Sequence, residues 1–176
     1  LVLHGELFRG GFGIAAEFGH FRVVPDGRIC GCGNHGCWEQ YSSGMALVRC
    51  ARELATAAPI RMPRLLESVG SDVSAITGPL VTAAALAGDP GALECFATVG
   101  RWLGEGLASL AAILDPDCFV IGGGVADSGQ LLLEPAQAAF AATLTGGAYR
   151  PHAPVVLAEL GSSAGLVGAA DLARIR

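Results

Sequence analysis

The sequence predicts an α/β fold on three observations. Residues 90–114 carry one apolar helical stripe, and two short β-rich runs follow at 118–121 and 155–157. A helix-capping residue follows each short run, so helix and strand alternate, as they do in sheets covered by helices. With 176 residues, of which 52% are hydrophobic, the chain is long and apolar enough for about one domain with a buried core.

The amino-terminal part predicts short strands and turns. Residues 2–8 are typical of two strands joined by a His4-Gly5 turn, in which glycine supplies a positive φ. Residues 21–24 are β-rich and predict another strand, which Pro25-Asp26-Gly27 ends as a turn. The first strand is so short that we expect it to begin upstream of Leu1.

A helical region follows. A helix is expected to begin near Cys37, and Ser43 is placed to cap a second helix over residues 45–57. Between residues 59 and 78, prolines and a glycine break the pattern into short helical pieces. A further helix is predicted over residues 79–87.

The strongest helix prediction begins after Asp89-Pro90 and ends at Asp115-Pro116. Its apolar residues recur at spacings of three and four, which is one helical face: Leu93, Phe96, Gly100, Leu103, Leu107, Leu110 and Leu114. Gly104 and Gly106 should each cost about 1 kcal/mol relative to alanine inside a helix. We therefore expect another backbone or a ligand to pack closely against them.

The carboxyl-terminal third predicts two buried strands, 118–121 and 155–157, each followed by a helix. The expected caps are Asp127 or Ser128 for the first of these helices, with Pro135 inside it, and Ser162 or Ser163 for the second. Cys50, Cys95 and Cys118 lie in apolar surroundings and are expected to be small buried side chains.

Composition excludes several classes of protein. The net charge is −5 without a basic run, which argues against nucleic-acid binding by these residues. Lysine is absent, so a Walker-type phosphate loop is excluded. No signal peptide is visible, and no apolar run approaches the ~20 residues that span a bilayer, so we expect a reduced cytoplasmic protein without membrane contact.

A cysteine and histidine cluster predicts a metal site. Cys30, Cys32 and Cys37 lie within eight residues, and His20 precedes them, which gives four ligands of the kind that structural zinc prefers. Gly31, Gly33 and Gly36 are expected to permit the tight turns of such a knuckle. The alternatives are a disulfide and a chance cluster in a glycine-rich loop, and His35 is a rival ligand that we expect to point away.

Two other groups could bind ligands. Gly122, Gly123 and Gly124 follow a predicted strand at the edge where α/β sheets bind ligands, although a tight turn without a ligand is an equal alternative. Their spacing is not the dinucleotide fingerprint, which argues against a nicotinamide cofactor. Glu17 and Glu39 flank the predicted zinc ligands; a carboxylate suits sugar hydroxyls, but helix capping or support of the metal's histidine are alternatives.

The metal-site sequence resembles a known family. Glu17-Phe18-Gly19-His20 and the run from Cys30 to Glu39 are similar to the signature of the ROK (repressor, open reading frame, kinase) family of sugar kinases and repressors. The resemblance continues through Leu114-Asp115-Pro116 and the three glycines, and within the family it is greatest to actinobacterial glucokinases. Departures include Ala16, where glycine is common, and Trp38, where leucine is usual.

The resemblance implies an actin/hexokinase-like (ribonuclease H-like) ATPase fold with an inserted zinc knuckle. It also implies that Glu17, His20 and Glu39 bind glucose or a related hexose, that His20 holds structural Zn²⁺ through its other ring nitrogen, and that Gly122, Gly123 and Gly124 lie against ATP. The expected activity is phosphorylation of glucose at the 6-hydroxyl, with Mg²⁺ and ATP. The expected alternatives are a sugar-sensing repressor and a catalytically inactive sugar-binding module.

By the same resemblance, residues 1–176 form the carboxyl-terminal part of a two-domain kinase. Its expected segments are a zinc and sugar segment at 15–44, an α/β nucleotide segment at 79–163, and a closing helix at 164–176. The amino-terminal domain and the aspartate that acts as catalytic base are expected upstream of Leu1, so the fragment alone should be inactive. The intact protein is expected to be a homo-oligomer.

Overall fold

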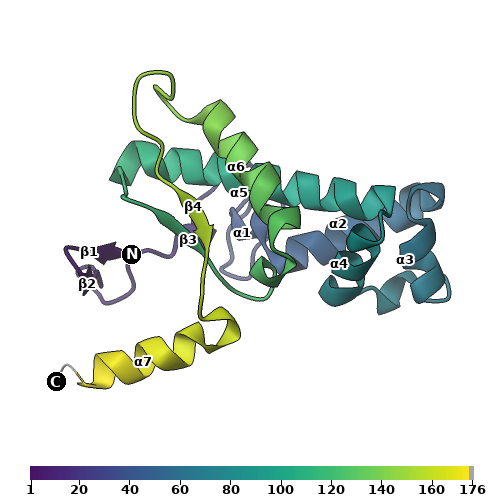
Figure 1. The fold of residues 1–176 in the computed structure, drawn as a ribbon, viewed down its shortest axis with the longest axis horizontal. Helices are drawn as coiled ribbons and strands as arrows, with labels where there is room; N and C mark the ends of the chain where they lie inside the picture. The colour runs from purple at the N-terminus through teal and green to yellow at the C-terminus, as the bar shows by residue number, and fades with distance from the viewer. Residues whose placement is uncertain (175–176) are drawn as a thin grey trace. The chain divides into compact units, whose positions relative to one another are not determined.

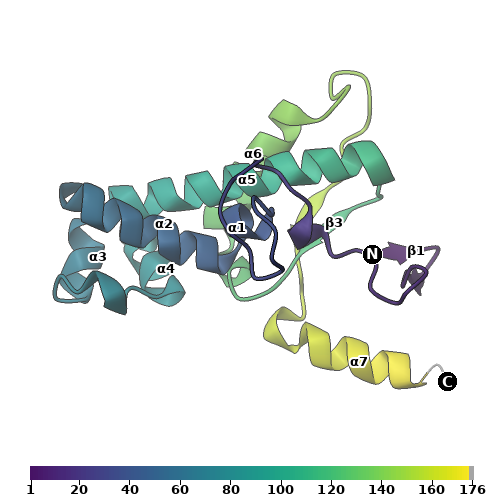
Figure 2. The same ribbon diagram turned by 180° about the vertical axis from the view of Figure 1, so that it is seen from behind.

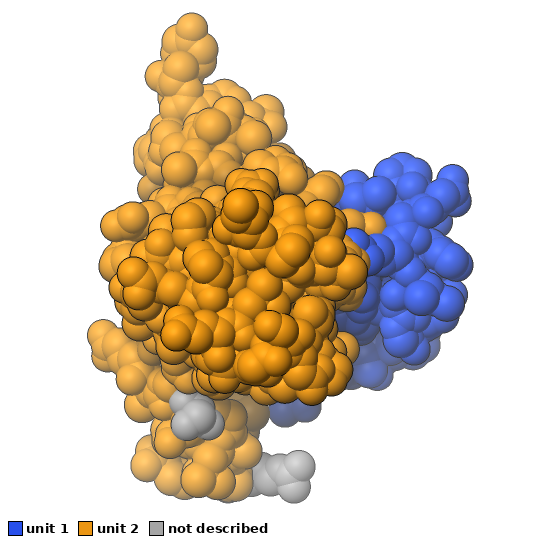
Figure 3. Space-filling model, turned by 90° about the vertical axis from the view of Figure 1, so that its right-hand side faces the viewer, with its two compact units in different colours: residues 1–40 blue, residues 41–176 orange. Residues whose placement is uncertain are grey.

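The computed structural model describes residues 1–174, so the last two residues of the predicted closing helix, and the side chain of Ser162, lie outside the description. The chain divides into two compact units, residues 1–40 and residues 41–176 (Figure 3). Each unit is described by itself below.

The first unit begins with the predicted hairpin. Strands β1 (Val2–Leu3) and β2 (Glu6–Leu7) pair antiparallel, and the turn residues His4 and Gly5 both have positive φ, 54° and 80°. A two-residue turn with positive φ at both positions matches the twist of the strands that it joins. This prediction is confirmed.

The strand predicted over residues 21–24 is wrong. After a 3₁₀ turn, η1 (Phe18–His20), this segment forms only a single bridge, between Arg22 and Cys37. The amides of Val23 and Val24 both donate to the Gly36 carbonyl, so the segment pairs with the cysteine loop instead of a sheet. The turn that follows is confirmed: Asp26 has a φ of 53°.

Helices begin at the end of the first unit, with α1 (Glu39–Ser42) and then α2 (Gly44–Ala57). The Ser43 hydroxyl accepts a hydrogen bond from the Ala46 amide at 3.2 Å, which is the predicted cap. The broken region after α2 is confirmed as short pieces: η2 (Pro59–Arg61), α3 (Pro63–Ser68) and η3 (Val73–Ala75).

Asp89 joins two helices of the second unit. It follows α4 (Gly78–Leu86), is fully buried, and accepts from the Ala92 amide at the start of α5 (Pro90–Leu114). Its other carboxylate oxygen accepts from the amides of Arg64 and Leu65 in α3. The Asp89 carboxylate therefore accepts hydrogen bonds from backbone amides at the starts of two helices, α3 and α5. The sequence predicts its role at the start of α5 but not its role at the start of α3.

Helix α5 lies at the centre of the second unit, with α2 and α6 packed against it (Figures 1 and 2). The predicted stripe is buried except at its ends, where Leu93 is 41% exposed and Leu114 is half-buried. Ala92 and Cys95 occupy the inward positions near the start of the helix. The helix ends at Asp115, as predicted, with a left-handed φ of 44°.

Among residues 1–174, no single helix has the length and hydropathy to cross a bilayer, although α4 and α5 meet both criteria as a pair bent by 115°.

Helix α6 (Gln130–Thr143) crosses α5 at its glycines. A Cβ at Gly104 would lie 2.7 Å from both the Ala139 Cβ and the Phe140 amide nitrogen, and one at Gly100 would lie 2.6 Å from Pro135. The prediction of a backbone against Gly104 is confirmed.

The predicted cap of α6 is wrong. Gly129, with a φ of 62°, precedes the helix, and the Ser128 hydroxyl donates instead to the Val125 carbonyl in the turn η4 (Ala126–Ser128).

The two predicted strands, β3 (Phe119–Ile121) and β4 (Val155–Leu157), form a parallel pair. Helix α6 contacts the pair: Phe140 packs against Phe119, and the Gln137 amide donates to the Val155 carbonyl at 2.9 Å. The prediction that both strands are buried is wrong, because Val120 is 60% exposed. Cys118, just before β3, is also exposed.

The chain continues through η5 (Gly161–Ser163) into α7 (Ala164–Arg174). The predicted closing helix therefore exists over its described residues. None of them is buried, and Leu166 on its predicted apolar face is 76% exposed.

Candidate metal centre

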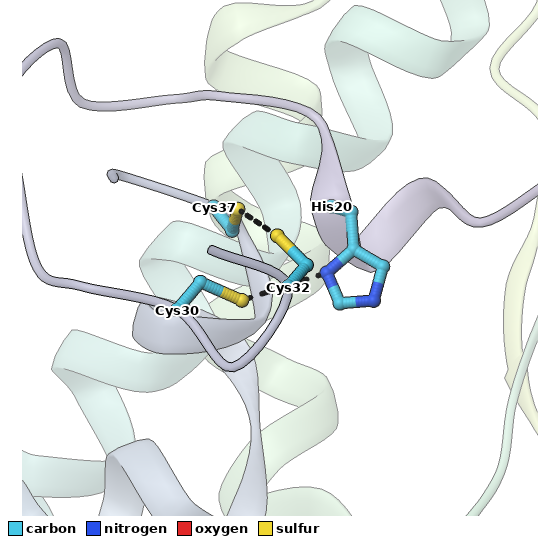
Figure 4. Close-up of side chains that lie close together, drawn as sticks. All are labelled: His20, Cys30, Cys32 and Cys37. Atoms are coloured by element: carbon cyan, nitrogen blue, oxygen red, sulfur yellow. Dashed lines mark hydrogen bonds between the residues drawn. The ribbon is translucent and has the colours of Figure 1, made fainter. Parts of the chain in front are cut away.

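The first unit brings the four predicted metal ligands together. The ligand atoms of His20, Cys30, Cys32 and Cys37 all lie within 4.8 Å of one another (Figure 4). Cys32 Sγ is 3.6 Å from Cys37 Sγ, and Cys30 Sγ is 3.6 Å from His20 Nδ1. A tetrahedral zinc with Zn–S bonds of about 2.3 Å separates its ligands by about 3.8 Å. The donor set and these spacings therefore fit zinc.

The backbone of residues 28–37 holds these thiols in a compact loop. The Cys30 amide donates to the Asn34 carbonyl, and the Gly36 amide donates to the Arg28 carbonyl, both at 2.8 Å. Gly33 and Gly36 have positive φ values of 89° and 76°, as predicted, whereas Gly31 does not. At Gly36 a Cβ would also collide with the Val24 carbonyl group, so glycine is required there for two reasons.

Histidine orientation distinguishes the two candidate nitrogen ligands. The Nδ1 atom of His20 faces Cys30, while its Nε2 atom points away from the three sulfur atoms (Figure 4). His35 instead places Nδ1 3.1 Å from the Gly27 carbonyl and is exposed. The prediction that His35 points away from the cluster is confirmed.

Glu39 lies directly beside the cluster. The Cys30 thiol donates to Glu39 Oε1 at 2.9 Å, and the same oxygen is 3.7 Å from His20 Nδ1. The Glu39 side chain is still 40% exposed. A Cβ at Gly19 would lie 3.4 Å from the Glu39 Cβ, which is ordinary van der Waals contact, so Glu39 packs against the turn that carries His20.

Glu17 starts the same turn as His20. The Glu17 carbonyl accepts from the His20 amide at 3.0 Å, and the Glu17 side chain is exposed. Ala16, just before it, has a left-handed φ of 68°. A left-handed backbone is less costly for glycine than for a residue with a Cβ, so this position is strained for alanine.

The three thiols differ in acidity. The Asn34 backbone amide lowers the pKa of Cys32 to about 7, and Cys32 is exposed. A hydrogen bond from the Cys32 amide lowers the pKa of Cys30. The hydrogen bond between the Cys30 thiol and Glu39, together with burial, outweighs this effect and raises the Cys30 pKa to about 12. Burial raises the pKa of Cys37. A metal would have to displace protons from Cys30 and Cys37, so its binding should release protons.

The predicted glycine site lies in the second unit, after β3. Gly123 has a φ of 88°, and a Cβ at Gly123 or Gly124 would meet no atom within 4 Å. A Cβ at Gly122 would lie 3.5 Å from the Ala158 Cβ, just beyond β4. Bare backbone is therefore present at the carboxyl edge of both strands, where a phosphate or nucleotide could approach.

Comparisons with known proteins show which proteins this chain is similar to. The sequence pattern of the ROK family matches residues 1–176. The glucokinase of Streptomyces coelicolor is 49% identical over 174 residues, which is 99% of this chain and 55% of that protein. The Escherichia coli N-acetylglucosamine repressor is 32% identical over 161 residues, which is 91% of this chain and 37% of the repressor.

A solved structure is similar along nearly the whole chain. It is a ROK family glucokinase from Streptomyces griseus in complex with glucose and AMPPNP, 53% identical, with a TM-score of 0.94 over 98% of this chain and 55% of that one. The chain thus spans about half the length of the relatives that it matches.

Proposed function

Because the chain belongs to the ROK family, whose solved sugar kinases have the actin/hexokinase-like ATPase fold, we propose that it is part of an ATP-dependent glucokinase. The reaction would transfer the γ-phosphoryl group of ATP to the 6-hydroxyl of glucose. The observation that carries this proposal is the backbone agreement, at 53% identity, with a glucokinase that was crystallised with glucose and an ATP analogue.

We assign the proposed binding roles to three segments of the chain. Residues 15–44 would bind sugar and zinc, residues 79–163 would bind nucleotide, and residues 164–176 would form a closing helix. Residues 1–176 would be the carboxyl-terminal part of the kinase. The catalytic base, an aspartate, would come from the part of the relatives' length that this chain does not span.

The sugar contacts would be made by Glu17, His20 and Glu39. Two properties of Glu39 support its role: it is fixed beside the proposed metal ligands through Cys30, and its side chain remains 40% exposed. A carboxylate can accept hydrogen bonds from two neighbouring hydroxyls. His20 supports the arrangement because Nδ1 faces the sulfur atoms, which leaves Nε2 to donate to or accept from a hydroxyl.

Zinc is proposed as a structural ion held by His20, Cys30, Cys32 and Cys37. When bound, it would cross-link the loop and hold the histidine ring in one orientation, and four protein ligands would leave it no open position for chemistry. The chain's own residues would then orient the sugar. Glu39 would lose the thiol proton that Cys30 now donates to it, and sugar hydroxyls would supply replacement donors.

The nucleotide is proposed to lie against Gly122, Gly123 and Gly124, with Mg²⁺ accompanying ATP. Support comes from the left-handed Gly123 and the open space beside Gly123 and Gly124. With no Cβ in the way, backbone amides can approach phosphate oxygens closely.

The test is Glu39→Gln in the full-length protein. This change keeps the shape of the side chain but replaces one acceptor oxygen by a donor, which should cost about 1.5–3 kcal/mol for a charge-assisted hydrogen bond. Glucose affinity should therefore fall about tenfold to a hundredfold, since 1.4 kcal/mol is a factor of ten. Isothermal titration with glucose, and the rate of glucose 6-phosphate formation, measure the effect.

The matched control is Glu134→Gln, an exposed glutamate on α6 that the proposal does not use. Zinc content should stay near wild type in both variants. If Glu39→Gln lost zinc while its folded fraction bound glucose normally, Glu39 would be a structural support and the sugar assignment would be wrong. A wild-type protein that binds glucose but forms no glucose 6-phosphate with ATP would favour the repressor or the inactive module over the kinase.

A further inference from the structure

Two cysteines outside the metal centre lie together between α2 and α5. Cys50 is on α2 and Cys95 is on α5, and the two helices pack side by side (Figures 1 and 2). The Cys50 and Cys95 thiols are hydrogen-bonded, and this contact, together with burial, raises the pKa of Cys95.

The helix register places these thiols opposite each other independently of that hydrogen bond. One turn further along α2, Leu54 meets Gly91, one turn earlier on α5: a Cβ at Gly91 would lie 3.1 Å from Leu54 Cδ2. Before α2, the Tyr41 ring packs on Trp102 at 4.9 Å between centroids. Contacts that advance along one segment and retreat along the other indicate antiparallel packing, and Cys50 opposite Cys95 falls within that series.

The two thiols differ in their access to solvent. Cys95 is fully buried, whereas Cys50 is partly exposed. Their helices approach closely there because the neighbouring inward residues are small: Ala51 and Ala92 are both fully buried. Rotation of two cysteine side chains at such an interface can reach the S–S bond length of about 2.05 Å. A small oxidant would therefore approach the pair from the side of Cys50, the more exposed of the two residues.

We propose that Cys50 and Cys95 are a site of oxidative modification, where a small hydroperoxide converts the thiol pair into a disulfide that links α2 to α5. In the first step, the Cys50 thiolate attacks the terminal oxygen of the hydroperoxide, the O–O bond breaks, and Cys50 becomes a sulfenic acid while an alkoxide leaves (hydroxide when the oxidant is hydrogen peroxide). In the second step, the Cys95 sulfur attacks the Cys50 sulfur, the S–S bond forms, and water leaves. The peroxide takes the two electrons that the two thiols lose.

The test treats the full-length protein, as purified, with hydrogen peroxide, followed by thiol blocking, trypsin and mass spectrometry. Cleavage after arginine releases residues 50–52 and residues 65–101 as separate peptides in the reduced protein. Oxidation should join them into one species about 2 Da lighter than their sum, and reductant should separate it. The thermal unfolding midpoint of the oxidised protein should rise by several degrees, because a cross-link restricts the unfolded chain.

Cys50→Ser should abolish the linked species and the shift in midpoint, while Cys118→Ser, at an exposed cysteine, should keep both. Cys50 that becomes sulfinic acid, or that links to Cys118 or to another chain, while Cys95 stays reduced would overturn the proposal. The measurement does not depend on kinase activity or on glucose, so it stands apart from the proposed function.

Discussion

The two units achieve their order by different means. Within residues 1–40, the buried hydrophobic residues are Cys30, Cys37 and Trp38, and two of these three are candidate metal ligands. In residues 41–174, the helices α2, α4, α5 and α6 bury continuous apolar faces against one another. We therefore expect the fold of the first unit to depend on a bound metal, whereas the second unit is held by packing.

Removing one proposed metal ligand should have the largest effect, because it should unfold the first unit and leave the second folded. Cys32→Ser should abolish zinc binding, whose contribution in small zinc peptides is about 10–16 kcal/mol at neutral pH. Amides of residues 22–38 should lose protection from hydrogen exchange, while amides of α5 keep theirs. Metal analysis should find one zinc per wild-type chain and none in the variant.

Cys118→Ser serves as the control, because Cys118 is exposed and outside the cluster. The contrast between the units would fail if the loop amides remained protected in zinc-free Cys32→Ser.

A second prediction concerns the acidity of the metal-free thiols. With a pKa of about 7, Cys32 is largely thiolate above neutral pH, while Cys30, at about 12, keeps its proton. Iodoacetamide should therefore alkylate Cys32 first in chelator-treated protein, and the rate should fall as pH drops below 7 because the reactive thiolate is lost. Peptide mapping over a pH series measures this, and preferential alkylation of Cys30 would contradict it.

A substitution at Gly104 tests whether close packing of α6 against α5 stabilises the second unit. Gly104→Ala places a methyl group 2.7 Å from the Ala139 Cβ and the Phe140 amide nitrogen, so α6 must move away from α5. Overpacking of this kind costs about 1–3 kcal/mol, and contact with backbone favours the upper end. The unfolding midpoint in urea should fall, with zinc content unchanged.

Gly168→Ala provides a matched control, since a Cβ there meets no atom within 4 Å on the exposed α7. It should leave stability unchanged or raise it through helix propensity, by up to about 1 kcal/mol. Equal destabilisation by both variants would mean that the close crossing of α5 and α6 is not what makes glycine necessary at position 104.

The contrast between the units also explains which features the sequence could predict. Local chemistry was sufficient for α5, because Asp89, Pro90 and Asp115 mark its ends. It was also sufficient for the clustering of His20 and the three cysteines, because their spacing is itself the signal. The strand expected at residues 21–24 failed since its amides donate to Gly36 in the cysteine loop, a partner that no local pattern specifies.

Burial was harder to predict than secondary structure. Strand β3 is apolar, yet Val120 is 60% exposed, because hydropathy says which residues could be covered and not what covers them. The start of α6 was missed for a related reason: Ser128 is a good cap by type, but its hydroxyl donates to Val125 one turn earlier. The exposed Cys118 is a third case, where apolar neighbours in sequence did not become neighbours in the core.

The smallest expected effect is at Ala16. It tests whether backbone strain next to the proposed metal ligands lowers the stability and the zinc affinity of the first unit. Ala16 holds a φ of 68° immediately before Glu17, a conformation that costs a residue with a Cβ about 1–2 kcal/mol. Ala16→Gly should remove that cost, but glycine also gains about 0.4–1 kcal/mol of conformational freedom in the unfolded chain. The net gain should lie between about 0 and 1.6 kcal/mol, and because folding and zinc binding are coupled, zinc affinity should rise by at most about fifteenfold.

Competition with a chelator of known affinity can resolve this change in zinc affinity. Ala15→Gly is the matched control, because Ala15 lacks a positive φ, so glycine there relieves no strain and zinc affinity should fall slightly. Opposite signs at two adjacent alanines would indicate an effect of the backbone conformation, since both substitutions remove one methyl group but only Ala16→Gly relieves a left-handed residue. If both variants weakened zinc equally, the left-handed residue would not be strained, and the order of the first unit would depend on its ligands alone.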